Sequence, residues 1–157
     1  MARFLALAAT LLCAFAPAVT AVEVVKLEND EAFEEKVIQS RHVWAVLFTS
    51  GRAGDDSAEA LKVIEEVATT VDSFKIGVAD VDAVKAFASE FNVRKRMAPR
   101  MLVFNSRARQ AEVIALKGAV PWASALLAQI KLHLKENALH GAHYEKVTLA
   151  IGGKDEL

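Results

Sequence analysis

Positive charge is concentrated in one segment of the chain, which begins at Arg94 and ends at Arg109. No acidic residue occurs between Glu90 and Glu112. The basic residues of this segment are Arg94, Lys95, Arg96, Arg100, Arg107 and Arg109. Guanidinium groups bind carboxylates through paired hydrogen bonds, so the segment could hold an acidic peptide or protein partner. The alternative is a solvated loop, because exposed charges usually contribute little. Both interpretations stay open.

A second candidate site is the run Arg52-Ala53-Gly54-Asp55, which follows an apolar stretch of the sequence. Arg52 and Asp55 could bind a carboxylate or pair with each other. Aspartates at the start of a helix are also ordinary N-cap residues, however, and both Asp55 and Asp56 stand where a helix is expected to begin. We favour the capping role.

Histidines near the C-terminus are the remaining candidates for metal coordination. They are His133, His140 and His143, and no cysteine or paired carboxylate cluster accompanies them to complete a coordination sphere. We therefore expect no metal and no cofactor. No nucleophile with a partnered base and no phosphate-binding loop is recognisable, so we assign no catalytic residue.

The two ends of the chain predict its route through the cell. Arg3 precedes an apolar run over residues 4–16 that is too short to span a membrane, which is typical of a signal peptide. Small residues at Val19 and Ala21 predict cleavage before Val22, so residues 1–21 form the signal. The chain ends in Lys154-Asp155-Glu156-Leu157, a retention signal read by the KDEL receptor. We expect the protein in the lumen of the endoplasmic reticulum.

The expected mature chain, residues 22–157, has the size of one domain and contains no thiol, because Cys13 lies in the signal peptide. The full chain has a formal charge of −1, and the loss of Arg3 changes this to −2. No global field therefore draws the protein to nucleic acid, and no second apolar run predicts membrane insertion. We expect a globular domain over residues 22–136 and a tail over residues 137–157.

Hydrophobic periodicity predicts alternating strands and helices. Residues 43–49 are almost continuously apolar, which is typical of a central strand covered on both faces. Further strands are predicted at residues 22–27, 74–81, 101–104 and 112–116. Helices are predicted after a cap at Asn29 or Asp30, from Asp56, over residues 83–91 and from Pro121. Trp44 and Trp122 are expected in the core. The alternating residues 147–151 could add an edge strand or form a loose spacer.

This order of elements belongs to the α/β class with a mixed sheet. The chain resembles the thioredoxin fold, and more narrowly the domains of protein disulfide isomerases, over about residues 22–136. The matching segments are Ala45-Val46-Leu47-Phe48, Ala79-Asp80-Val81-Asp82, Phe91-Asn92-Val93-Arg94 and Ala98-Pro99 before a Met-Leu-Val-Phe strand. The resemblance implies a thioredoxin-like three-layer sandwich with a mixed central sheet.

The resemblance also implies that redox chemistry has been lost. Catalytic members carry a Cys-x-x-Cys motif at the start of the second helix, where this chain has residues 52–55 without cysteine. Two supporting positions of the family are occupied by Val46 and Val120. Pro99 matches the family's proline loop, which is typically cis and presents backbone groups to an extended client peptide.

We therefore expect a redox-inactive relative of the disulfide isomerases that escorts or chaperones other proteins. Its partners would be unfolded or nascent secretory proteins, or a larger folding factor of the endoplasmic reticulum. The expected contact residues are Ala98, Pro99, Arg94, Arg96 and Arg100. An enzyme of the disulfide-isomerase family by descent, or another activity at the altered site 52–55, remains the alternative.

Overall fold

The structure is a computed structural model that describes residues 21–52, 54–105, 110–134, 139–140 and 143–146. Residues 1–20 of the expected signal peptide and the whole retention signal therefore lie outside the described residues. The same is true of Ala53, Arg107, Arg109 and the alternating stretch 147–151.

A five-stranded mixed sheet forms the centre of the molecule, with the strand order β1-β3-β2-β4-β5. The strands are β1 (Val24–Leu27), β2 (Trp44–Thr49), β3 (Lys75–Asp80), β4 (Arg100–Phe104) and β5 (Glu112–Ala115). Strands β1, β3 and β2 are parallel, whereas β4 runs antiparallel to both β2 and β5. The predicted mixed sheet and the predicted β4–β5 hairpin are confirmed.

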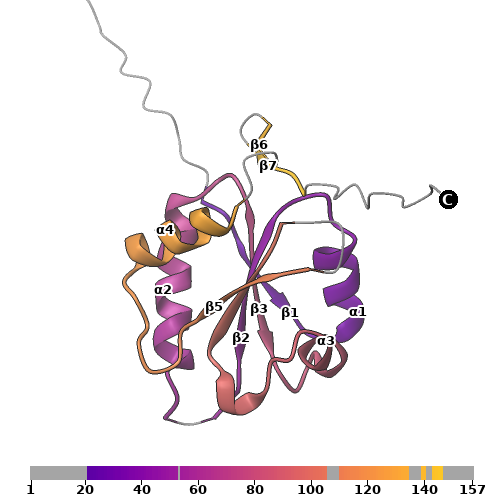
Figure 1. Cartoon of the computed structure of the whole chain (residues 1–157), viewed down its shortest axis with the longest axis vertical. Helices are drawn as coiled ribbons and strands as arrows, with labels where there is room; N and C mark the ends of the chain where they lie inside the picture. The colour runs from indigo at the N-terminus through magenta and orange to yellow at the C-terminus, as the bar shows by residue number, and fades with distance from the viewer. Residues whose placement is uncertain (1–20, 53, 106–109, 135–138, 141–142, 147–157) are drawn as a thin grey trace, which may run out of the picture.

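Helices cover both faces of the sheet and complete a three-layer sandwich (Figure 1). One face carries α1 (Asp30–Phe33), which continues as the π-helix η1 (Glu34–Ile38), and α3 (Lys85–Glu90). The other face carries α2 (Ser57–Thr70) and α4 (Ala123–His133). A short 3-10 helix, η2 (Lys95–Met97), precedes β4. The predicted α/β sandwich is confirmed.

Alternation along β2 divides the core into two apolar layers. Ala45 and Leu47 pack in the layer under α2 and α4, whereas Trp44, Val46 and Phe48 pack in the layer under α1 and α3. This double burial explains why residues 43–49 are almost continuously apolar. The helix start predicted near residue 29 is also confirmed, because Asn29 is the N-cap of α1 and its Oδ1 accepts a hydrogen bond from the Ala32 amide at 2.8 Å.

The prediction that Trp122 belongs to the core is wrong, since 74% of its surface is exposed. Trp122 has an extended backbone and stands at the N-cap of α4, before the helical register begins. The inward positions of α4 are Ala123, Leu126 and Ile130, which follow helical spacing from the first helical residue. Trp44, by contrast, is buried as predicted.

The segment after α4 packs against the end of the sheet where β2 begins. We call its described residues, 139–140 and 143–146, the strap. Strands β6 (Leu139–His140) and β7 (His143–Tyr144) form a short hairpin. The Val43 amide donates to the Tyr144 carbonyl at 3.3 Å, and the Lys146 amide donates to the Arg41 carbonyl at 2.6 Å. The buried ammonium of Lys146 donates to the carbonyls of Val37 and Ile38 at the end of η1. Part of the expected tail therefore packs against the domain.

Burial lowers the pKa of the Lys146 ammonium to about 8. Desolvation disfavours the charged form, and this opposes the stabilisation from the two carbonyl contacts.

None of the helices in the described residues combines the length and the apolar character that are needed to cross a membrane.

Candidate functional site

Three loops meet at the opposite end of the sheet, where β2 and β3 finish and β4 starts. Thr49 and Asp80, the last residues of the two parallel strands, lie in register, and Arg100 lies beside Phe48. Open α/β sheets bind ligands outside the carboxyl ends of their parallel strands. The loops at this edge are residues 50–52 with 54–56, residues 81–84 and residues 94–99. The described positions of the predicted sites 52–55 and 94–100 therefore come together here.

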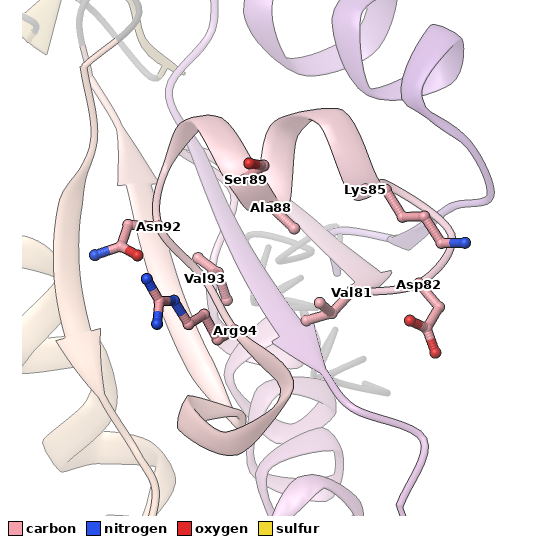
Figure 2. Close-up of a pocket in the computed structure, with 8 residues that line it drawn as sticks. All are labelled: Val81, Asp82, Lys85, Ala88, Ser89, Asn92, Val93 and Arg94. Atoms are coloured by element: carbon pink, nitrogen blue, oxygen red, sulfur yellow. The ribbon is translucent and has the colours of Figure 1, made fainter.

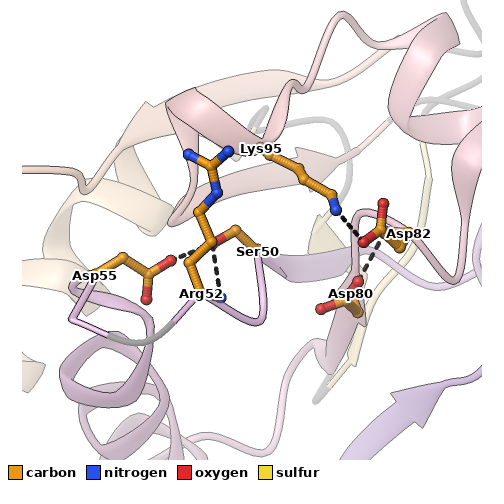
Figure 3. Close-up of polar contacts among 6 residues, drawn as sticks. All are labelled: Ser50, Arg52, Asp55, Asp80, Asp82 and Lys95. Atoms are coloured by element: carbon orange, nitrogen blue, oxygen red, sulfur yellow. Dashed lines mark hydrogen bonds and ion pairs between the residues drawn. The ribbon is translucent and has the colours of Figure 1, made fainter.

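The turn after β2 is held by hydrogen bonds within itself (Figure 3). The Ser50 hydroxyl donates to the Asp55 carboxylate and accepts from the Arg52 amide at 3.2 Å. Gly51 has a φ of +62°, and a Cβ at this position would lie 3.0 Å from the Asp80 carboxylate. The positive φ favours glycine at position 51, and any larger residue would also require the Asp80 carboxylate to shift by a few tenths of an ångström.

Asp55 precedes the N-cap residue of the second helix, Asp56, and it bonds to the first amide of this helix rather than pairing with Arg52. Its Oδ1 accepts a hydrogen bond from the Ser57 amide at 3.1 Å. The Ser50 hydroxyl lowers the pKa of the Asp55 carboxyl below its ordinary value, with smaller contributions in the same direction from Ser57 and Lys117 and an opposing effect of burial. Arg52 is exposed, and Figure 3 shows its guanidinium extending away from the Asp55 carboxylate.

Asp56 has a role that the sequence did not indicate. It stands at the N-cap position of α2 without a side-chain capping bond, and its Oδ2 instead accepts a hydrogen bond from the Gly118 amide at 2.6 Å. The neighbouring Lys117 ammonium donates to the Arg96 carbonyl. These two bonds connect the turn after β2 and the basic loop to residues 117–118, so the three segments form one face.

The basic residues of the predicted contact loop differ in their exposure. Arg94 and Arg96 are exposed, whereas Lys95 pairs with Asp82 (Figure 3). Arg100 lies inside β4 and is half-buried, and its Nε is buried without a hydrogen-bond partner. Considering the described residues alone, the unpaired positive charge of this loop is therefore at Arg94 and Arg96.

Ala98 and Pro99 lie between the basic loop and β4, and the peptide bond between them is cis. Both residues are buried. Their side chains present almost no surface, so any contact with a partner at this position would involve backbone groups and the neighbouring arginines.

The hydroxyl group of the turn after β2 is buried and is held by a hydrogen bond within the turn. Ser50 is 4% exposed and engaged with Asp55, and residues 22–157 contain no cysteine. Among the residues that the structure describes, no group of three histidine, cysteine, aspartate or glutamate side chains is placed to hold a metal ion. The sequence had pointed to Arg52, Asp55 and the basic loop. It had not pointed to the role of Ser50 within the turn, or to the roles of Asp56 and Lys117, whose partners lie on other segments.

Neither a protein-family model nor a curated protein sequence matches this chain. Solved structures of thioredoxins do match it. The thioredoxin of Malassezia sympodialis, a member of a pan-allergen family, aligns with a TM-score of 0.57 and 20% identity over 71% of this chain and 91% of its own. The reduced thioredoxin pre-protein of Schistosoma mansoni aligns with a TM-score of 0.57 and 16% identity over 70% and 97%.

The thioredoxin of Trypanosoma brucei brucei gives a similar result, with a TM-score of 0.54 and 16% identity over 73% of this chain and 92% of its own. At these identities the likeness concerns the fold and not the activity. Together with the five-stranded mixed sheet and its two helical layers, it shows that this chain has a thioredoxin-like α/β fold.

Proposed function

We propose that this thioredoxin-like protein is a redox-inactive binding protein of the endoplasmic reticulum lumen. It holds unfolded or nascent secretory proteins, or a larger folding factor, through the face built by residues 50–52, 54–56, 94–99 and 117–118. We call this surface the loop face. The proposed address rests on the predicted signal peptide, residues 1–21, and on the C-terminal tetrapeptide, residues 154–157.

The observation that carries the proposal is the way the loop face is held together. The Asp55 carboxylate accepts hydrogen bonds from the Ser50 hydroxyl and the Ser57 amide, and the Asp56 carboxylate accepts one from the Gly118 amide. Both carboxylates therefore hold the loops of this face together. The exposed side chains of this face include Arg52, Arg94 and Arg96. A face whose loops are held by internal hydrogen bonds and whose cations are exposed is a preorganised binding surface. Such a surface loses little conformational entropy when a partner binds.

An enzyme at the altered turn is the weaker candidate. Ser50 is the hydroxyl that contacts a carboxylate here, but it is buried and its proton points to Asp55. A nucleophile must be within reach of a substrate and next to a group that removes its proton. The Ser50–Asp55 contact is better explained as part of the fold of the turn.

The proposal can be tested by site-specific photo-crosslinking of the full chain in the secretory pathway of cultured cells. A photoreactive residue replaces Arg96 on the loop face, and a matched variant carries it at Lys36, an exposed residue of η1 near the strap. We expect crosslinks to secretory proteins or to a folding factor from position 96 and far fewer from position 36. Equal crosslinking from both positions would refute the loop face as the binding surface.

The same cells test the proposed address. A variant lacking residues 154–157 is expected in the medium, whereas the full chain stays inside the cell. A full chain that never enters the secretory pathway would overturn the proposed location. Many different crosslinked proteins would indicate a chaperone-like role, and one stoichiometric partner would indicate an accessory subunit.

A further inference from the structure

A pocket of about 370 Å³ lies along α3, beside the loop face (Figure 2). Its floor consists of Val81, Ala88 and Val93, which are 7%, 3% and 3% exposed and belong to the core layer under α1 and α3. The floor is therefore apolar and fixed by packing. Its volume falls in the range of small-ligand sites, about 300–1,000 Å³. We call this pocket the α3 groove.

The backbone at the end of α3 forms one wall of the groove. Asn92 adopts a left-handed conformation with a φ of +52°, which ends the helix. The Val93 amide then donates to the Ala88 carbonyl at 2.7 Å. This returns Val93 to the core and leaves the exposed Arg94 at the rim. The sequence Asn92-Val93-Arg94 thus supplies a turn, a floor residue and a cation in three consecutive positions.

The rim carries a net positive charge. Asn92 and Arg94 lie at one end, Asp82 and Lys85 lie at the other, and Ser89 lies between them (Figure 2). Asp82 is neutralised by its ion pair with Lys95. In the part of the chain that the structure describes, neither Lys85 nor Arg94 forms an ion pair with an acidic side chain. An apolar floor thus lies between two available cations.

We propose that the α3 groove binds an acidic peptide segment that carries an apolar side chain between carboxylates. The apolar side chain lies on Val81, Ala88 and Val93, and the flanking carboxylates contact Lys85 and Arg94. Ser89 and Asn92 offer hydrogen-bonding groups to the peptide backbone. This inference rests on the proposed function and names the chemistry of its partner. Lys85 and Ser89 belong to the groove alone, however, and Arg96 belongs to the loop face alone.

Titration of isotope-labelled chain 22–157 with a short peptide, followed by NMR, tests the inference. The probe is N-acetylated, C-amidated Glu-Glu-Leu-Glu-Glu, and the control is the same peptide with lysine in place of each glutamate. We expect amide shifts over residues 85–94 with the acidic probe only. Its affinity should decrease with added salt, because exposed charges are screened.

Three charge reversals then separate the groove from the rest of the surface. Lys85→Glu should weaken binding of the acidic probe about tenfold at low ionic strength, because an attraction becomes a repulsion. Arg96→Glu on the loop face and Lys62→Glu on the exposed side of α2 should change the affinity less than about threefold. Unfolding midpoints of the three variants show whether each one folds.

Three results would overturn the α3 groove. The first is equal weakening by Lys85→Glu and Lys62→Glu, and the second is equal binding of the two peptides. The third is a set of shifts confined to residues 96–99 and 117–118 that disappears in Arg96→Glu, which would leave the loop face intact and remove the groove. If the acidic probe binds the groove but position 96 gives no crosslinks in cells, the groove stands and the proposed loop face fails.

Discussion

Replacing Phe33 should separate α1 and α3 from the sheet. Phe33 is completely buried and touches aromatic rings on three other elements. Its ring centroid lies 4.7 Å from that of Phe87 on α3, 5.8 Å from that of Phe48 on β2 and 5.7 Å from that of Phe104 on β4. This one side chain therefore joins two helices and two strands, and α3 carries the proposed groove.

The expected cost of Phe33→Ala follows from these contacts. Truncation of a buried phenylalanine to alanine costs about 3–5 kcal/mol, including the cavity that it leaves. Each well-placed aromatic pair contributes about 0.5–1.5 kcal/mol beyond the area that it buries. With three such pairs, we expect a decrease of about 4–5 kcal/mol in the free energy of unfolding, near the upper end of that range.

Urea unfolding of chain 22–157, followed by circular dichroism, measures this change. We expect an unchanged m-value and a lower midpoint. Unfolding entropy of about 2.1 cal/mol/K per residue converts the loss to a decrease of about 15 °C in Tm for a chain of this length. The control is Leu132→Ala on α4, because the side chain of Leu132 is 83% exposed. Its effect should stay within about 0.5 kcal/mol.

A loss below about 2 kcal/mol for Phe33→Ala would refute the reasoning. Such a result would mean that α1 and α3 are held to the sheet by other contacts. If the loss equals that of Leu132→Ala, the aromatic cluster does not stabilise the domain. If Phe33→Ala is destabilised as expected, the acidic peptide should also bind more weakly, because the floor of the α3 groove is part of the same layer.

Three further predictions concern the strap, the loop face and the absence of a thiol. Lys146→Met leaves two carbonyls without their donor and should lower the free energy of unfolding by about 1–3 kcal/mol at pH 7. The loss should be seen as faster hydrogen exchange at the Tyr144 amide. Lys131→Met, at an exposed position of α4, should have no such effect. Because the pKa of Lys146 falls from 10.5 to about 8 on folding, the penalty for burying its charge is present below pH 8 and is relieved as the pH rises to 10.5. The difference in free energy of unfolding between the native chain and Lys146→Met should therefore increase over this interval. A difference that decreases would contradict a buried ammonium. Asp55→Ala should lower the free energy of unfolding by about 0.5–2 kcal/mol at pH 7, compared with no more than about 0.5 kcal/mol for Glu65→Ala. This loss should become smaller as the pH drops below the ordinary carboxyl pKa and Asp55 becomes protonated. A loss that persists in acid would show that the charge of Asp55 is not responsible. Chain 22–157 should not catalyse insulin reduction, and dithiothreitol should leave its unfolding midpoint unchanged, because it has no cysteine; a shifted midpoint would contradict this.

Local patterns in the sequence predicted the elements well. The apolar run over residues 43–49 indicated a strand buried on both faces, and β2 is that strand. Asn29 was a predicted cap, and its side chain does cap α1. These predictions succeed because burial on both faces of a strand and capping of a helix depend on residues close together in the chain. The prediction that Trp122 is buried was wrong because the burial of this side chain depends on which residue begins α4. Hydrophobic spacing alone does not determine that residue.

The sequence by itself determined the order of the five sheet strands and the four helices that cover them, the absence of a thiol in residues 22–157 and the concentration of cations between residues 94 and 109. Only the tertiary structure decided which of those cations are available, because Lys95 is neutralised by Asp82 and Arg100 lies half-buried in β4. It also joined Asp56 to Gly118, and Lys146 to the end of η1, across 62 and more than 100 residues of sequence. Composition and periodicity describe which residues a segment buries. They carry no information on which distant segment will supply the partner, since that depends on how the strands are ordered in the sheet.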